Sequence, residues 1–154
     1  RHGVYIFKAA PFSPDEELRT AWLSLDPSRT VAKRLQAPEQ IVICTTSAGQ
    51  QHGIGDFGTP QHDFTAQTGN IPEQKTFDYA SEHGKEDTEI SDGLPLTTPT
   101  RIIFDLLAER QNLVHISRLI ADAERKGLKV AWPGLVINVL KFAAYYQLTA
   151  DDLL

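Results

Sequence analysis

The chain contains no methionine, not even at position 1, and only one cysteine, Cys44. A single cysteine cannot form an internal disulfide, and it cannot build a zinc site from several thiolates. A lone thiol is compatible with a reducing compartment, so we expect a cytoplasmic protein. Because the sequence begins with RHGVYIF, in the middle of a predicted strand, we also expect it to lack an upstream segment of its protein.

Long apolar runs and an excess of positive charge are lacking as well. The longest apolar pattern, residues 135–148, is interrupted by Asn138 and Lys141, which favours a core helix over a membrane span. The formal net charge is −5, whereas a domain that binds DNA or RNA on its own usually carries a basic surface. The sequence therefore argues against a membrane protein and against an autonomous nucleic-acid-binding module.

Familiar catalytic motifs are also missing. No G-x-S-x-G turn is present, and Ser47 and His52 lie five positions apart, on different faces of a helix. The glycine-rich segment 53–58 lacks the following lysine of a phosphate-binding loop. Cys44 follows the apolar triplet 41–43, which predicts a buried, unreactive side chain rather than a thiolate nucleophile.

The composition is that of one globular domain. The chain has 154 residues, of which 41% are hydrophobic and 23% are charged. A chain of this length and composition can bury a hydrophobic core without disulfides or structural metals. Alternation and apolar triplets predict short strands, and apolar spacing near 3.6 predicts helices. We expect one α+β domain over residues 1–154, with a small mixed or antiparallel sheet packed against several helices and a helical C-terminal third. The predicted strands cover 4–7, 41–43, 62–66, 76–79, 88–90 and 94–97, and the predicted helices cover 14–25 (capped by Ser13), 30–35, one or two turns within 45–58, 99–110, 113–126 and 133–147.

Residues 91–110, SDGLPLTTPTRIIFDLLAER, combine a turn at Asp92-Gly93, a strand and the start of a helix. Thr98 is the predicted N-cap, and Pro99 suits the first helical position. Arg101 and Asp105 follow one turn apart on the same face. Because arginine stays protonated and should hold Asp105 ionised, neither residue suits general acid–base catalysis. We expect these four residues to fix how the helix leaves the strand.

Charged residues elsewhere suggest contacts with a partner. Arg29, Lys33 and Arg34 form a basic cluster that is typical of a solvated helix face. Together with His52 they are the candidate contacts for a partner or a nucleic acid. The acidic stretch 82–92 predicts a mobile loop, and the alternative is a protein-interaction module that recruits a basic partner through this stretch.

Four potential metal ligands lie within twelve positions of each other: His52, Asp56, His62 and Asp63. Imidazole and carboxylate groups bind divalent metals, although no H-x-x-x-H or H-E-x-x-H spacing places two of them on one helix face. The alternative enzymatic hypothesis is therefore a small metal-dependent nuclease or hydrolase that uses this cluster. It requires the four side chains to converge on a shared ion.

Four motifs, in this order, resemble the C-terminal region of the AbiE-type antitoxins (AbiEi) of bacterial type IV toxin–antitoxin systems. They are HGVYIF, EELRTAWLSLDP, TSAGQQHGIGDF and DGLPLTTPTRIIFDLL, and together they span nearly the whole chain. Members of this family are antitoxins and transcriptional regulators that act in abortive infection, a form of phage defence.

The resemblance implies a non-enzymatic antitoxin domain, without catalytic residues, metal or cofactor. It implies that a winged helix-turn-helix domain precedes the GVY strand, binds operator DNA and represses the operon. The functionally linked toxin would be nucleotidyltransferase-like and would form no stable complex with the antitoxin. This chain departs from many relatives between the His-Gly and Asp-Gly-Leu-Pro segments, where an arginine-rich strand pair is replaced by the acidic NIPEQKTFDYASEHGKEDTEI.

Overall fold

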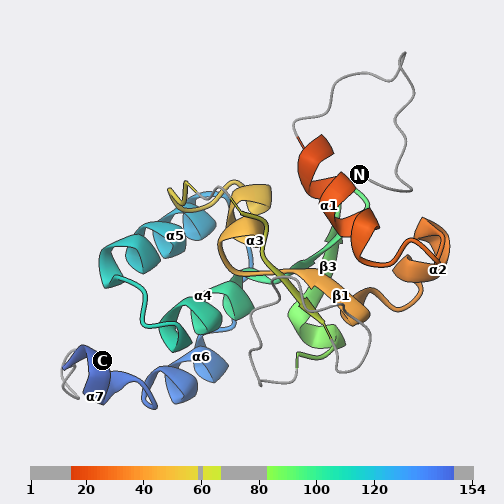
Figure 1. The fold of residues 1–154 in the computed structure, drawn as a ribbon. Coiled ribbons are helices and arrows are strands. Elements are labelled where there is room, and N and C mark those ends of the chain that lie inside the picture. The colour runs from red at the N-terminus through yellow and green to blue at the C-terminus, as the bar shows by residue number, and fades with distance from the viewer. Residues whose placement is uncertain (1–14, 59–60, 67–82, 148–154) are drawn as a thin grey trace.

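The strands form one four-stranded sheet in a computed structural model that describes residues 15–58, 61–66 and 83–147 (Figure 1). Strand β1 runs antiparallel to β2 and parallel to β4, while β3 and β4 form an antiparallel hairpin. The sheet is mixed and packs against helices, which confirms the predicted α+β class. The strand order is β2-β1-β4-β3, with β1 at Ile41–Ile43, β2 at Phe64–Ala66, β3 at Thr88–Ser91 and β4 at Leu94–Thr97.

The two central strands are buried along their whole length. Strands covered on both faces are continuously apolar, and this explains the triplet IVI of β1. Helix α1 (Glu16–Leu25) packs against this strand, and its Trp22 indole Nε1 donates a hydrogen bond to the Ile41 carbonyl oxygen at 3.0 Å. Helix α3 (Thr45–His52) follows β1 and contacts β4. The central strands therefore link the N-terminal helices to the C-terminal ones.

Helix α4 (Pro99–Ala108) forms the centre of the helical part, because it lies between α5 (Leu113–Arg125) and α6 (Trp132–Val139) (Figure 1). Each fully buried leucine or isoleucine stabilises the fold by about 1.5–3 kcal/mol relative to an exposed one. Helix α5 turns a single apolar stripe toward α4, as expected for a surface helix. The buried apolar side chains of α4 are Ile102, Ile103, Leu106 and Leu107.

The described part of the acidic stretch, residues 83–92, is structured, which corrects the prediction of a mobile loop over 82–92 and confirms the predicted strand over 88–90. This part forms the 3₁₀ helix η2 (Lys85–Asp87) and the edge strand β3. A two-residue turn at Asp92 (φ 49°) and Gly93 (φ 73°) then returns the chain into β4, as expected for a hairpin with two left-handed residues. The stretch is ordered because β3 pairs with β4 along four residues.

The ends of two helices differ from the predictions. Helix α1 begins at Glu16, whereas its predicted first residue Pro14 and predicted cap Ser13 lie outside the described residues. The predicted strands 4–7 and 76–79 also lie outside them. The single helix predicted over 133–147 is instead divided into α6 and the short α7 (Ala143–Tyr146). Tertiary packing explains the break, because the intervening turn places the ring of Phe142 5.8 Å from that of Phe104 in α4.

The longest described helix, α5, has 13 residues. No helix in the described part of the chain combines the length and the apolar content that crossing a bilayer requires.

Candidate functional site

The start of α4 carries the buried ion pair that the sequence indicated. The Thr98 hydroxyl accepts a hydrogen bond from the Arg101 backbone N–H at 3.3 Å, and Pro99 occupies the first helical turn. Arg101 Nε then donates to Asp105 Oδ1 at 2.7 Å, and both side chains are more than nine-tenths buried. The predicted cap and the predicted pair are both present.

A second carboxylate, which sequence reasoning missed, completes this junction. Asp87, at the end of η2, accepts a hydrogen bond from Arg101 Nη1 at 3.0 Å. The Asp87 carbonyl oxygen also accepts from the Thr98 backbone N–H at 2.9 Å. Arg101 therefore joins the beginning of the β3–β4 hairpin to α4. The available signal was the acidic run before β3, because the five N–H donors of an arginine can bond to more than one carboxylate.

The pKa of Asp105 is opposite in direction to the sequence-based expectation. Burial raises it from 3.8 to about 6, and the attraction and hydrogen bond of Arg101 offset only part of this effect. The like charge of Asp87 raises it further. Only the direction of the shift was wrong, because helical spacing reveals the neighbouring arginine but not how completely the chain covers the carboxyl group. With a pKa of about 6, Asp105 is still mostly ionised at neutral pH, as expected.

His52, a candidate contact for a partner or a nucleic acid, belongs to the same junction. Its Nε2 lies 2.9 Å from the Thr97 carbonyl oxygen, and its side chain is 4% exposed. Because a carbonyl only accepts hydrogen bonds, Nε2 carries the proton and donates it. Its Nδ1 faces the Glu89 carboxylate of β3 at 3.5 Å. His52 therefore ties the end of α3 to both strands of the hairpin.

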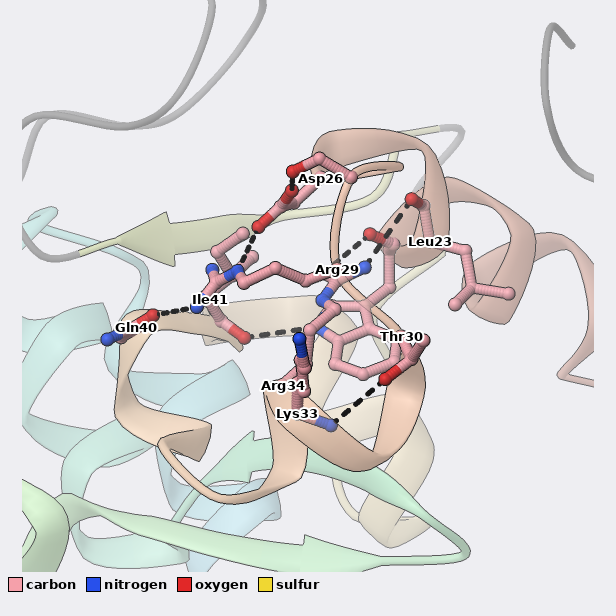
Figure 2. A network of polar contacts seen from close by, with 10 residues as sticks. Leu23, Asp26, Arg29, Thr30, Lys33, Arg34, Gln40 and Ile41 are labelled. Carbon is pink, nitrogen blue, oxygen red and sulfur yellow. Dashed lines mark hydrogen bonds and ion pairs between the residues drawn. The ribbon is translucent and has the colours of Figure 1, made fainter.

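Two of the three cations of the basic cluster around α2 (Val31–Leu35), Arg29 and Arg34, make polar contacts within the chain, as Figure 2 shows. Arg34 is 3% exposed, and its guanidinium lies 3.7 Å from the centre of the Trp22 ring. It donates hydrogen bonds to the carbonyl oxygens of Trp22, at 2.8 Å, and Leu23, at 3.4 Å. Burial lowers the pKa of Arg34 to about 10, which still leaves it protonated at neutral pH. The prediction of a solvated face was wrong for this residue.

Arg29 is also engaged within the chain. It donates to the Asp26 carboxylate and to the Gln40 side-chain oxygen (Figure 2). The crevice between Arg29, Arg34 and Trp22 leaves no room for a water molecule. Of the three predicted contact cations, only Lys33 is fully exposed. This cluster therefore holds α2 against α1 and offers one free positive charge.

A second polar centre fixes the corner between β1 and α3. The Asp63 carboxylate accepts hydrogen bonds from the hydroxyl groups of Thr45, at 2.8 Å, and Thr46, at 2.6 Å. The Asp63 backbone N–H donates to the Ser47 hydroxyl oxygen at 2.8 Å. Thr45 has a φ of 44°, which is strained for a β-branched residue. Asp63 thus holds a strained corner in place.

Cys44 precedes this corner and is buried, as the sequence predicted. Burial, followed by the nearby negative charges of Asp63 and Asp105, raises the pKa of its thiol well above the usual value. A covered thiol of raised pKa does not serve as a nucleophile at neutral pH.

The four residues of the metal hypothesis do not assemble into a site. His52 and Asp63 are engaged as described above, whereas Asp56 pairs with His115 at 3.1 Å and with Arg118 on α5. Within the described ranges, no three His, Cys, Asp or Glu side chains are arranged to hold a metal ion. The geometry required by the nuclease or hydrolase alternative is therefore missing from the described residues, which include all four candidates: His52, Asp56, His62 and Asp63.

Comparisons of this chain with protein-family models, with curated proteins and with solved structures found no match.

Proposed function

We propose that this chain is the antitoxin domain of a type IV toxin–antitoxin system, acting in the cytoplasm without an enzymatic activity of its own. Its protein would also repress the operon, with operator DNA bound mainly by a winged helix-turn-helix domain. The linked toxin would be nucleotidyltransferase-like and would form no stable complex with this chain. The proposal rests on the resemblance of four ordered motifs to AbiE-type antitoxins.

One structural observation carries the support for this proposal. Three parts of the resemblance are the most specific: GVY near the start, 47–53 and 93–105. The last two are separated in sequence but meet at one buried junction. His52 Nε2 contacts the Thr97 carbonyl oxygen at 2.9 Å across 45 positions. The contact makes the two motifs parts of one structural unit, which supports reading them together.

The distribution of polar groups supports a non-enzymatic role over the hydrolase alternative. Arg101, Asp105, Asp63 and Arg34 each bond to groups of the chain itself. An active site instead needs a nucleophile, base or metal ligand that is directed into an open cavity. The buried polar groups of this chain therefore support a domain that acts through its surface.

Co-expression with the toxin tests the proposal. The nucleotidyltransferase-like gene of the same operon is induced in a bacterial host, with and without the chain 1–154, and growth is measured. We expect the toxin alone to arrest growth, and the chain to restore it without co-purifying with the toxin. A harmless neighbouring gene, or continued arrest in the presence of the full-length protein, would refute the antitoxin assignment.

The variant Asp105→Ala separates folding from activity in the same assay. We expect protection to fall only in proportion to the folded protein, measured by circular dichroism and by soluble yield. The matched variant Lys33→Ala changes an exposed residue and should protect as well as the wild type. A fully folded Asp105→Ala chain without protection would contradict the structural role of the Arg101–Asp105 pair.

A further inference from the structure

Helix α6 is apolar on more sides than the fold covers. Its sequence, WPGLVINV, is typical of a helix that is buried all round. In the structure, however, only Leu135 is fully buried, and Val139 packs partly against the core. Half of the large hydrophobic side chains that are exposed in the described residues lie together here, and they form what we call the α6 face: Trp132, Val136, Ile137 and Leu140.

The α6 face is held rigidly against α4. At its beginning, the Ala131 backbone N–H donates to the Thr100 hydroxyl at 2.8 Å. After its end, the rings of Phe142 and Phe104 are in contact, and the Tyr146 hydroxyl donates at 2.7 Å to a carbonyl oxygen just beyond α4. The exposure of the face is therefore a property of a fixed helix. Concentrated apolar surface on a fixed element marks an interaction site.

Helix α7 follows α6 after three intervening residues, and a hollow of about 500 Å³ lies beside α7. It is lined by Arg110, Tyr145 and Tyr146 among others, and the Arg110 guanidinium lies 4.8 Å from the centre of the Tyr145 ring. Tryptophan, tyrosine and arginine are the residues that most often dominate binding energy in protein interfaces. The hollow therefore has the composition of a protein-binding surface, whereas the α6 face contributes one residue of this kind, Trp132.

The nearest charged residues in sequence on either side of α6 are both positive. Residues 125–150 contain four Lys and Arg residues and no Asp or Glu, on a chain whose net charge is −5. Lys129 and Lys141 lie just before and just after α6, are exposed, and pair with no carboxylate in the described residues. An occupant that carries carboxylates would neutralise both lysines, which favours a partner with acidic flanks.

These charges argue against a second copy of the chain as the occupant. Two α6 faces that pack together, parallel or antiparallel, would bring their flanking lysines into proximity, and the described residues between Lys129 and Lys141 include no carboxylate. An anionic bilayer would also satisfy the charge, but two flanking lysines are fewer than the roughly four to eight basic residues that typically direct a helix to anionic lipids. We propose that the α6 face docks an amphipathic helix of a partner protein whose apolar residues are flanked by carboxylates. This inference is independent of the antitoxin assignment.

A synthetic peptide provides the test. The probe is an amphipathic helix of about 18 residues, long enough to hold helical structure, with leucines along one face and glutamates elsewhere. A counter-probe carries lysines in place of the glutamates. Binding to the chain 1–154 is followed by fluorescence anisotropy of the labelled peptide and by the emission of Trp132, because the only other tryptophan, Trp22, is buried.

We expect the acidic peptide to bind, the basic peptide not to bind, and affinity to fall as salt is raised from about 50 to about 500 mM. Ile137→Ser should weaken binding about tenfold, because it removes the most exposed apolar side chain of the face. Ile90→Ser is the matched control, since Ile90 is a similarly exposed isoleucine on β3, and it should bind as the wild type does. Lys141→Glu should weaken binding, whereas Lys33→Glu should not.

Several outcomes would overturn the proposal. One is the absence of acidic-peptide binding. Equal binding of the acidic and basic peptides would be another. A third would be an equal loss of peptide affinity in the Ile137→Ser and Ile90→Ser variants, once circular dichroism has shown that both variants are folded. Two further measurements test the rival occupants. Trp132-dependent binding to phosphatidylserine vesicles without peptide binding would assign the face to a membrane. A dimer in analytical ultracentrifugation that is lost in Ile137→Ser would assign it to a second copy.

Discussion

The buried carboxyl group of Asp105 should make the stability of this chain fall as pH rises above about 4. Most paired carboxylates have the opposite effect, because pairing lowers their pKa in the folded state. Asp105 differs because burial raises its pKa to about 6, against 3.8 for the free side chain, even though Arg101 Nε is only 2.7 Å away.

The sign and the size follow from proton linkage. Between pH 3.8 and pH 6 the folded chain binds a proton at Asp105 that the unfolded chain has released, so the free energy of unfolding decreases with rising pH. The stabilising contribution is complete below about pH 3.8 and is lost as pH rises through 6. At 1.36 kcal/mol for each pKa unit, the difference amounts to about 3 kcal/mol.

Urea unfolding of the wild type and of Asp105→Asn, followed by tryptophan fluorescence at several pH values from about 4 to about 7, measures this contribution. The asparagine keeps an acceptor for Arg101 but cannot titrate, and all other ionisable groups cancel in the comparison. We expect the free energy of unfolding of the wild type, relative to the variant, to drop by about 2.4 kcal/mol across this range, which covers most of the full difference.

A relative stability that rises with pH would refute the reasoning, because it would mean that the Arg101 pair outweighs burial and lowers the pKa of Asp105. A difference that stays constant would show that Asp105 has the same pKa in both states. The carboxyl ¹³C shift of Asp105, titrated by NMR, checks the value directly and should have its midpoint near pH 6.

Three further predictions concern stability and are measured by chemical or thermal unfolding. Arg34→Ala should destabilise the chain by about 3 kcal/mol, since it removes the stack on Trp22 and the donors to buried carbonyl oxygens. The control Lys33→Ala should change stability by less than about 0.5 kcal/mol, and equal effects of the two variants would contradict the buried role of Arg34. Asp63→Ala should cost about 3 kcal/mol because the Thr45 hydroxyl loses its acceptor, and a neutral result would show that the corner holds without it. Thr97→Val should be neutral or stabilising by up to about 1 kcal/mol, because the buried Thr97 hydroxyl has no hydrogen-bond partner in the described structure; a clear loss of stability would reveal one.

Local sequence patterns were sufficient for the elements whose cause is local. The cap at Thr98, the proline that follows it and the pair four residues apart are all properties of one helix start, and the structure contains them. The apolar triplet of β1 and the Asp92-Gly93 turn were likewise predictable, since burial on both faces and a left-handed turn each select few residue types.

The remaining features depend on residues that are distant in sequence. Arg34 has the spacing of an exposed helical residue, and only the position of Trp22, brought close by the turn between α1 and α2, makes it a buried one. His52 resembled a surface ligand because nothing near it in sequence indicates Thr97 as its acceptor. The break after α6 depends on the contact between Phe142 and Phe104. Tertiary contacts override local propensity in each case.

The strained corner at Thr45 has a consequence for how the chain opens. Its left-handed backbone, at a φ of 44°, is held by the Asp63 carboxylate, which lies at the entrance to β2, the strand at one edge of the sheet. An edge strand is among the first elements to detach in local unfolding. When β2 detaches, Asp63 leaves with it, and the released strain favours unwinding of the first turn of α3. The amide protons of β2 and of this turn should therefore exchange with solvent as one cooperative unit, although 17 positions separate Thr46 from its acceptor.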